Sequence, residues 1–375
     1  MNLKATIYWA LMTLFMNTAN ADTLAPSDGI RPTILDPTAS QRVQRDFMAA
    51  VQKAATGQPP EGMGFLRPDS PLLPEAVKKA AKSVFAIAVP AGELVLANDI
   101  FKRLPLKEVI SKLQGMPDND NFGPADRAIY INQINNCLTM NVQDCKIFEG
   151  ISYGTAFVTG DGQDLRTALH VVIDFVKNAR ATGASAQIPI YLLDSNGKIV
   201  FDPQNITATV AATYEGALDT SIYEGKDMGR FNLDQVLIRL SSPISKPIPI
   251  ANRPFLEGEP AFIAGVAKRT EDRAIFNAKD SDGVSISVSR GTALGSGSLM
   301  KRLEKAGFNT NEISTSQMLR EGTAVTADGA PRSSGGAILN AQGEVVGVYN
   351  SGLPQSGAAF PSRVSYGGNS LLQIK

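Results

Sequence analysis

Residues 154–170 read GTAFVTGDGQDLRTALH and decide the fold of this chain. A short run of apolar and small residues turns at Asp161-Gly162 and continues into a second run, which is typical of a β-hairpin. The stretch ends at His170, the only histidine among 375 residues. We expect His170 where a strand gives way to a turn or helix, and any reaction that needs an imidazole must use it.

Further short strands separated by Gly, Asp-Gly and Asn-Gly turns follow from Tyr153 onward, with one helix expected over 298–305. This pattern indicates a β-barrel or a β-sandwich. Upstream, a helix over about 75–82 leads into an apolar strand, Ser83 to Val89. Two helices are then expected, one after Pro105 and one from Pro124 to about Leu138, as an inserted helical segment.

The composition excludes several classes of function. Lys and Arg number 36 and Asp and Glu number 36, so the formal net charge is zero. That balance lacks the basic footprint of nucleic-acid binding, and nucleic acid is therefore excluded as a partner. One histidine and two cysteines cannot build the usual multi-histidine or four-cysteine metal sites, so we expect no metal.

The first 21 residues are typical of a secretory signal peptide. Lys4 precedes an apolar run from Ala5 to Met16, and Ala19-Asn20-Ala21 is a small-x-small cleavage site. The apolar run is shorter than the roughly 20 residues that span a bilayer, so we expect no membrane span after cleavage. Export to the periplasm or the medium follows, and 22–78 form an N-terminal extension that is a propeptide, a linker or a packed arm.

Export makes a disulfide permissible between the two cysteines, Cys137 and Cys145. They lie eight positions apart, a span that closes as a small loop. The alternative is a pair of buried free thiols.

Three segments offer the groups that a serine nucleophile needs: a base, a carboxylate that orients the base, and backbone N–H donors for the oxyanion. The base is His170. Asp234 opens the strand DQVLIRL, and Ser334 lies in RSSGG, where two glycines permit a tight turn. Asp219 and Asp227 compete for the role of the acid. Ser333 competes for that of the nucleophile, but only Ser334 is followed directly by Gly-Gly.

Together the segments resemble the trypsin-like, chymotrypsin-fold serine proteases, especially secreted bacterial members. The matching motifs are GTAFV, TALH at 167–170, DQVLIRL at 234–240, SGG at 334–336 and EVVGV at 344–348. The order His-Asp-Ser also separates the chain from the subtilisins and the α/β-hydrolases. GISYG at 150–154 matches the α/β-hydrolase nucleophile elbow, but that family places its histidine last, so we attribute this match to chance.

The resemblance implies an all-β fold of two Greek-key six-stranded β-barrels, to which this sequence adds the helical insertion, without a counterpart in the family, and the N-terminal extension. The first barrel would cover residues 79–248, with the insertion at about 91–148, and the second 249–375. A specificity pocket would be formed by Asp328 at its base and by Tyr349, Asn350, Ser351 and Gly352 along its wall. For Asp328 the alternative is a solvated turn residue.

The resemblance further implies a serine endopeptidase that acts on protein or peptide substrates through an acyl-enzyme and without a cofactor. The N–H groups of Arg332 and Ser334 would form the oxyanion hole. The family usually has glycine two residues before the nucleophile, where this chain has Arg332. That departure keeps open a catalytically silent binding protein of the same fold, and an esterase would use the same triad.

Overall fold

The computed structural model describes residues 65–97, 106–117, 123–140, 144–182, 187–203, 208–213, 234–267, 284–305, 322–329, 332–353 and 364–368. The expected signal peptide, Asp219 and Asp227 lie outside these ranges. Within them, none of the helices combines the length and the apolar character needed to cross a bilayer.

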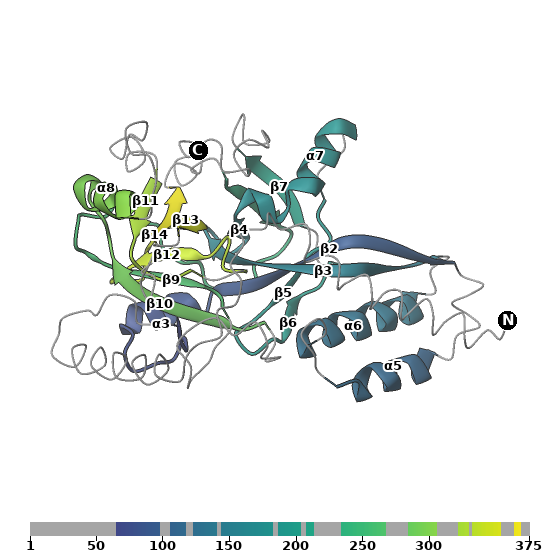
Figure 1. Ribbon diagram of the computed structural model, residues 1–375. Helices are drawn as coiled ribbons and strands as arrows, with labels where there is room; N and C mark the ends of the chain where they lie inside the picture. Colours follow the sequence, from purple (N-terminus) through teal and green to yellow (C-terminus); the bar gives the residue numbers. More distant parts are fainter. Residues whose placement is uncertain are drawn as a thin grey trace.

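The described chain folds mainly into two antiparallel sheets (Figure 1). The first sheet contains β2 (Val84–Ala97), β3 (Asp144–Thr159), β4 (Asp164–Thr167), β5 (Tyr191–Leu193), β6 (Ile199–Phe201), β7 (Ala208–Thr213) and β8 (Val236–Leu240). The second contains β1 (Phe65–Leu66), β9 (Pro260–Val266), β10 (Ile286–Thr292), β11 (Gly322–Val325), β12 (Ala337–Asn340), β13 (Val345–Leu353) and β14 (Val364–Gly368). The helices are α3 (Glu75–Ala81), α5 (Leu106–Gly115), α6 (Pro124–Met140), the 3₁₀ helix η2 (Leu169–Val171), α7 (Ile173–Thr182) and α8 (Ser296–Lys305).

Each sheet closes on itself through a short contact outside the named strands. In the first, the segment just before β5 pairs with β7, and Ile188 N–H donates to Ala208 O over 2.9 Å. In the second, the end of β10 pairs with β11, and Leu294 N–H donates to Ala324 O over 2.9 Å. The closed rings leave out the short flanking strands β6 and β1, so each ring has the six strands expected from the sequence.

Both rings have the same connectivity. Counted in chain order, the first three strands are neighbours in succession, and the sixth, fifth and fourth then complete the ring. This is the Greek-key order, in which the last strand returns beside an early one. In the first ring it places β8 beside β4, so residues distant in sequence are brought to one edge.

The period of two along β3 divides its side chains between two cores. Ala156 and Val158 belong to a cluster within the first barrel, whereas Phe157 lies in a second cluster that also contains Phe262 and Val345 of the other sheet. All five side chains are fully buried or nearly so. The second cluster therefore holds the two barrels together along β3.

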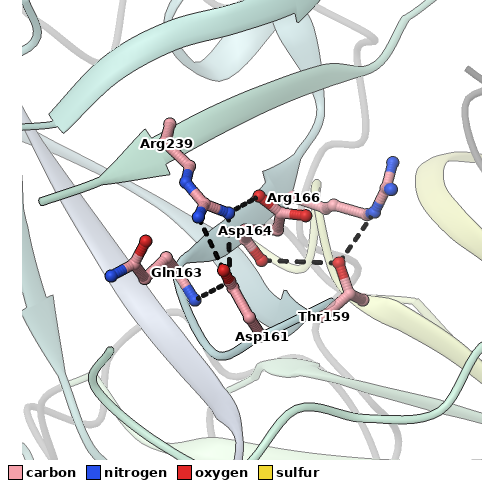
Figure 2. Close-up of polar contacts among 6 residues, drawn as sticks. All are labelled: Thr159, Asp161, Gln163, Asp164, Arg166 and Arg239. Atoms are coloured by element: carbon pink, nitrogen blue, oxygen red, sulfur yellow. Dashed lines mark hydrogen bonds and ion pairs between the residues drawn. The ribbon is translucent and has the colours of Figure 1, made fainter. Parts of the chain in front are cut away.

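An ion cluster at the β3–β4 turn supports the pairing of β4 with β8 (Figure 2). Arg239 on β8 contacts Asp164 and Asp161 with N–O distances of 2.6 Å each. Next to it, Arg166 Nε donates to Thr159 Oγ1 over 3.0 Å. Because the ion pairs are partly exposed, they contribute little stability singly, but together they favour the register Asp164↔Arg239.

The helical insertion is shorter than the sequence indicated. Residues 91–97 and 144–148 continue β2 and β3 as a long hairpin, because irregularities at Pro90 and Gly92 let β2 run past two residues that usually end a strand. In the described part of the inserted segment, α5 and α6 remain, and they lie beside this hairpin (Figure 1). The Phe148 ring packs edge-on against Tyr191, and Gln133 Oε1 of α6 accepts a bond from Phe148 N–H.

The last part of the expected extension packs into the core. Phe65 and Leu66 form β1 on the edge of the second sheet, and α3 follows. Leu73 and Val77 are 4% and 0% exposed in the cluster that both sheets share. Residues 65–81 therefore form a packed arm and not a loose linker.

Replacing Leu73 by Ala tests this packing. We expect the free energy of unfolding to fall by about 2–5 kcal/mol, the usual effect of removing a buried leucine side chain. Leu256→Ala is the matched control, because Leu256 is 63% exposed, and it should change stability by no more than about 0.5 kcal/mol. Denaturant unfolding measures both, and equal effects would refute the packed arm.

Candidate active site

The imidazole of His170 is held by one carboxylate in two ways. Asp234 Oδ2 lies 2.6 Å from His170 Nδ1, and Asp234 Oδ1 accepts the backbone N–H of His170 over 2.9 Å. An ionised carboxylate only accepts, so Nδ1 carries the proton and Nε2 is left as the basic nitrogen. His170 therefore has the orientation and tautomer that a general base requires.

The strand register brings these two residues together across 64 positions of sequence. Thr167 at the end of β4 pairs with Val236 at the start of β8, so His170 and Asp234 extend from the same edge. The chain turns into η2 at His170, as the sequence indicated. Asp234 is 3% exposed, whereas the His170 side chain is about one-third exposed, so the carboxylate is sheltered and the imidazole is accessible.

Two opposing effects act on the pKa of His170. Burial lowers it, but the negative charge of Asp234 and the hydrogen bond to Asp234 together outweigh burial. The net result is a pKa above the usual value of 6.5. The imidazole is thus a stronger base than an isolated histidine.

Ser334 lies in a tight turn that is fastened to the first barrel. Thr155 N–H of β3 donates to Ser334 O over 2.7 Å. The next residue, Gly335, has φ 88°, and a Cβ there would lie 2.0 Å from Thr155 O and 2.2 Å from Thr167 Oγ1. Only glycine fits at this position. The turn therefore lies directly against Thr167, three residues before His170 in the sequence.

The two adjacent serines have different surroundings. Ser333 is 1% exposed, and its hydroxyl donates to Val266 O of β9 over 2.8 Å. Ser334 is half-buried, and its hydroxyl is 3.5 Å from Asn350 O, at the outer limit of a hydrogen bond. Ser333 thus anchors the turn, and the Ser334 hydroxyl is the more accessible of the two.

Arg332 keeps the backbone conformation that glycine usually supplies. Its φ is 77°, and among the described residues it is the only one other than glycine with a positive φ. Its carbonyl accepts the hydroxyl of Thr155 over 2.8 Å, and the Thr155 hydroxyl in turn accepts Val266 N–H over 2.8 Å. The side chain at position 332 has therefore not displaced the turn, although a positive φ is costly for arginine.

Of the expected pocket residues, the structure describes the surroundings of Asp328, Tyr349 and Asn350. Tyr349 is buried in a core cluster of the second barrel, and its ring lies against Gly329, where a Cβ would be 2.1 Å from the hydroxyl. Asp328 is half-buried, and its carbonyl accepts the Ser289 hydroxyl. Asn350 is 4% exposed beside Ser334. Ser351 and Gly352 continue the backbone of β13, and the Ser351 side chain is outside the described part of the structure.

The structure also separates the chance match at 150–154 from an active site. Ser152 is exposed in the middle of the long strand β3, which pairs there with Val89 of β2, and not at a sharp strand-to-helix turn.

Among the described residues, no three His, Cys, Asp or Glu side chains gather as metal ligands would.

Sequence reasoning missed Thr155, which binds Arg332 O and Val266 N–H. The residue lies inside the GTAFV motif, but its contacts are 177 and 111 positions away along the chain. It also missed Tyr153, whose ring lies beneath the Arg332 guanidinium, and Asp126, which accepts the Tyr153 hydroxyl. No local pattern marks such contacts.

Comparison of the chain with protein families finds a match that spans this site. A family model described as trypsin-like peptidase domain matches residues 154–348, just over half of the chain, and the match spans His170, Asp234 and Ser334. No curated protein sequence matches.

Two solved structures are similar to the chain at 14% identity. One is the active form of the Rv3671c protease from M. tuberculosis, with a TM-score of 0.38 over 82% of this chain and 86% of that one. The other is the HtrA-type protease AlgW with a decapeptide, with a TM-score of 0.37 over 79% of this chain and 63% of that one.

The single histidine permits a direct test of the His170–Asp234 pair. One imidazole signal should titrate in NMR spectra of the folded protein with a pKa above 6.5. Asp234→Asn removes the charge and leaves the burial, so the pKa should fall. Asp161→Asn, at the distant ion pair with Arg239, is the control and should leave it unchanged. A pKa that does not respond to Asp234→Asn would contradict the pairing.

Proposed function

Because the chain belongs to the trypsin-like peptidase family, we propose that it is an exported serine endopeptidase with Ser334, His170 and Asp234 as its catalytic triad. The observation that carries the proposal is the double contact of Asp234 with His170, at 2.6 Å to the ring and 2.9 Å to the backbone. A buried carboxylate held in this way orients an imidazole and stabilises its protonated form.

In the proposed reaction, Ser334 Oγ attacks the carbonyl carbon of the scissile bond while His170 Nε2 takes the hydroxyl proton. His170 then gives this proton to the leaving amine as the C–N bond breaks and an ester to Ser334 remains. Water attacks the ester with His170 again as the base, which releases the acid and restores the hydroxyl. Asp234 stays ionised throughout and stabilises the imidazolium.

The oxyanion in each addition step would be bound by the N–H groups of Arg332 and Ser334. The positive φ of Arg332 supports this assignment, because the turn keeps the conformation open to glycine. The same observation weighs against a catalytically silent binding protein, since that alternative rested on a disrupted turn. An esterase would share every residue of this mechanism.

Export and the Cys137–Cys145 bridge are further parts of the proposal. The composition of the first 21 residues supports export. One finding supports the bridge: the described part of the chain, which includes the buried Cys137 of α6, holds no free thiol. Protein and peptide substrates follow from the family, and the wall of the specificity pocket would begin at Tyr349 and the adjacent Asn350.

Labelling by a fluorophosphonate tests the nucleophile. We expect one adduct, on Ser334 of the folded protein, identified by mass spectrometry of the digested chain. Ser334→Ala should abolish both labelling and peptide cleavage. Ser152→Ala, at the exposed serine of the chance GISYG match, is the matched control and should still label. A wild-type protein that does not label would rule out a working serine hydrolase.

The rate of labelling should also rise with pH through a single ionisation. Only neutral His170 can accept the serine proton, and its raised pKa moves the midpoint above 6.5. Activity is thus lost as the pH falls through that midpoint. Asp234→Asn should reduce the rate on the order of 10⁴-fold, because the imidazole loses its orientation and tautomer. A rate that is constant between about pH 5 and 8 would contradict this role of His170.

A further inference from the structure

The strained residue Arg332 reaches beyond its own turn. Its guanidinium carbon lies 5.4 Å from the centroid of the Tyr153 ring, within the range of a cation–π contact. Tyr153 is on β3, two residues before Thr155, which binds the Arg332 carbonyl. The backbone and the side chain of Arg332 are therefore both held by the same strand of the first barrel.

The contact continues into the helical insertion. The Tyr153 hydroxyl donates to Asp126 Oδ1 over 2.8 Å, and Asp126 Oδ2 accepts Gly123 N–H over 2.8 Å at the start of α6. A carboxylate in the first turn of a helix is favourably placed with respect to the helix dipole. Two hydrogen bonds therefore hold the Asp126 carboxylate, and the one from Tyr153 also holds the hydroxyl end of that ring in place.

The charges in this group support one another. Burial raises the pKa of Asp126, and the hydrogen bonds from Gly123 and Tyr153 and the charge of Arg332 offset only part of the rise. The pKa of the Tyr153 phenol is well above its usual range because of burial and the neighbouring Asp126. The phenol thus stays protonated as a donor, and Asp126 attracts the guanidinium.

We propose that Tyr153 and Asp126 are positioning residues that hold Arg332 in its left-handed conformation, so that the helical insertion supports the oxyanion turn. The inference rests on the proposed function for its catalytic consequence. Its structural basis does not depend on catalysis. Glycine adopts a positive φ without strain and arginine does not, whether or not the protein is an enzyme. A turn with arginine at this position needs contacts that a turn with glycine does not need.

A double-mutant cycle of Tyr153→Leu and Arg332→Gly tests the proposal. With Arg332 present, Tyr153→Leu should slow labelling of Ser334 about tenfold, a fraction of the loss on deleting an oxyanion donor. For a peptide substrate the loss should fall on kcat with KM nearly unchanged, since the oxyanion forms only in the transition state. In the Arg332→Gly background the same change should slow labelling less than about twofold. Equal losses in the two backgrounds would overturn the proposal.

The phenol has a matched control in Tyr191, which also joins a β-strand to α6. Its hydroxyl donates to Asn132 Oδ1 over 3.0 Å. Tyr153→Phe and Tyr191→Phe each remove one such hydrogen bond, but only Tyr153 lies beside Arg332. Tyr153→Phe should slow labelling, and Tyr191→Phe should not. If both slow it equally, the effect is a general loosening of the insertion and the proposal fails.

Denaturant unfolding of the four proteins in the double-mutant cycle separates this inference from the proposed function. These are the wild type, Tyr153→Leu, Arg332→Gly and the double variant. The midpoint should fall more for Tyr153→Leu in the presence of Arg332 than in the Arg332→Gly background, whether or not the protein is an enzyme. If the wild-type protein does not label but this coupling is found, the proposed function fails and the positioning role stands. Additive changes in the midpoint would overturn the positioning role whatever the labelling shows.

Discussion

The hydrogen bond from Thr155 N–H to Ser334 O, 2.7 Å long, joins the two barrels at the point where the proposed nucleophile and base must meet. Most of the other features of the site depend on it. It requires the turn after Ser334 to approach β3 so closely that Gly335 can carry no side chain. It also places the turn beside the end of β4, from which His170 extends. Because each barrel alone supplies only part of the proposed triad, the proposed chemistry would depend on this junction and not on either barrel by itself.

The Greek-key order explains why one junction between the barrels is enough to assemble the site. The order brings β8 beside β4 in the first barrel, so Asp234 reaches His170 without any contribution from the second barrel. In the second barrel it places β13 beside β12, where Gly335 N–H donates to Tyr349 O over 2.7 Å. The first ring therefore forms the His170–Asp234 pair by itself, whereas the turn at Ser334 is held by both rings. The shared core around Phe157 then brings them together.

The sequence allowed prediction of those features that a local pattern encodes. His170 and Ser334 lie in short motifs whose turn residues and strand periods can be read directly, and the alternation in DQVLIRL marks β8. The length of the β2–β3 hairpin was not predictable, because Pro90 and Gly92 are usual strand breakers and only the pairing with β3 carries the strand past them. The contacts of Thr155 and Tyr153 were not predictable either, since their partners are far away in sequence and nothing in composition marks them. The positive φ of Arg332 would not be expected of an arginine at all.

Arginine in a position that suits glycine changes how the turn is stabilised. A glycine turn is favourable by itself, so its neighbours are free to vary without affecting the backbone. With Arg332 the conformation is maintained by contacts made on both sides, the Thr155 hydroxyl at the carbonyl and the Tyr153 ring at the guanidinium. Tyr153 is held by Asp126 of α6, so an element inserted between two strands of the first barrel acts on the turn of the second. The strain at one residue thereby links a segment outside the barrels to the geometry on which oxyanion binding would depend.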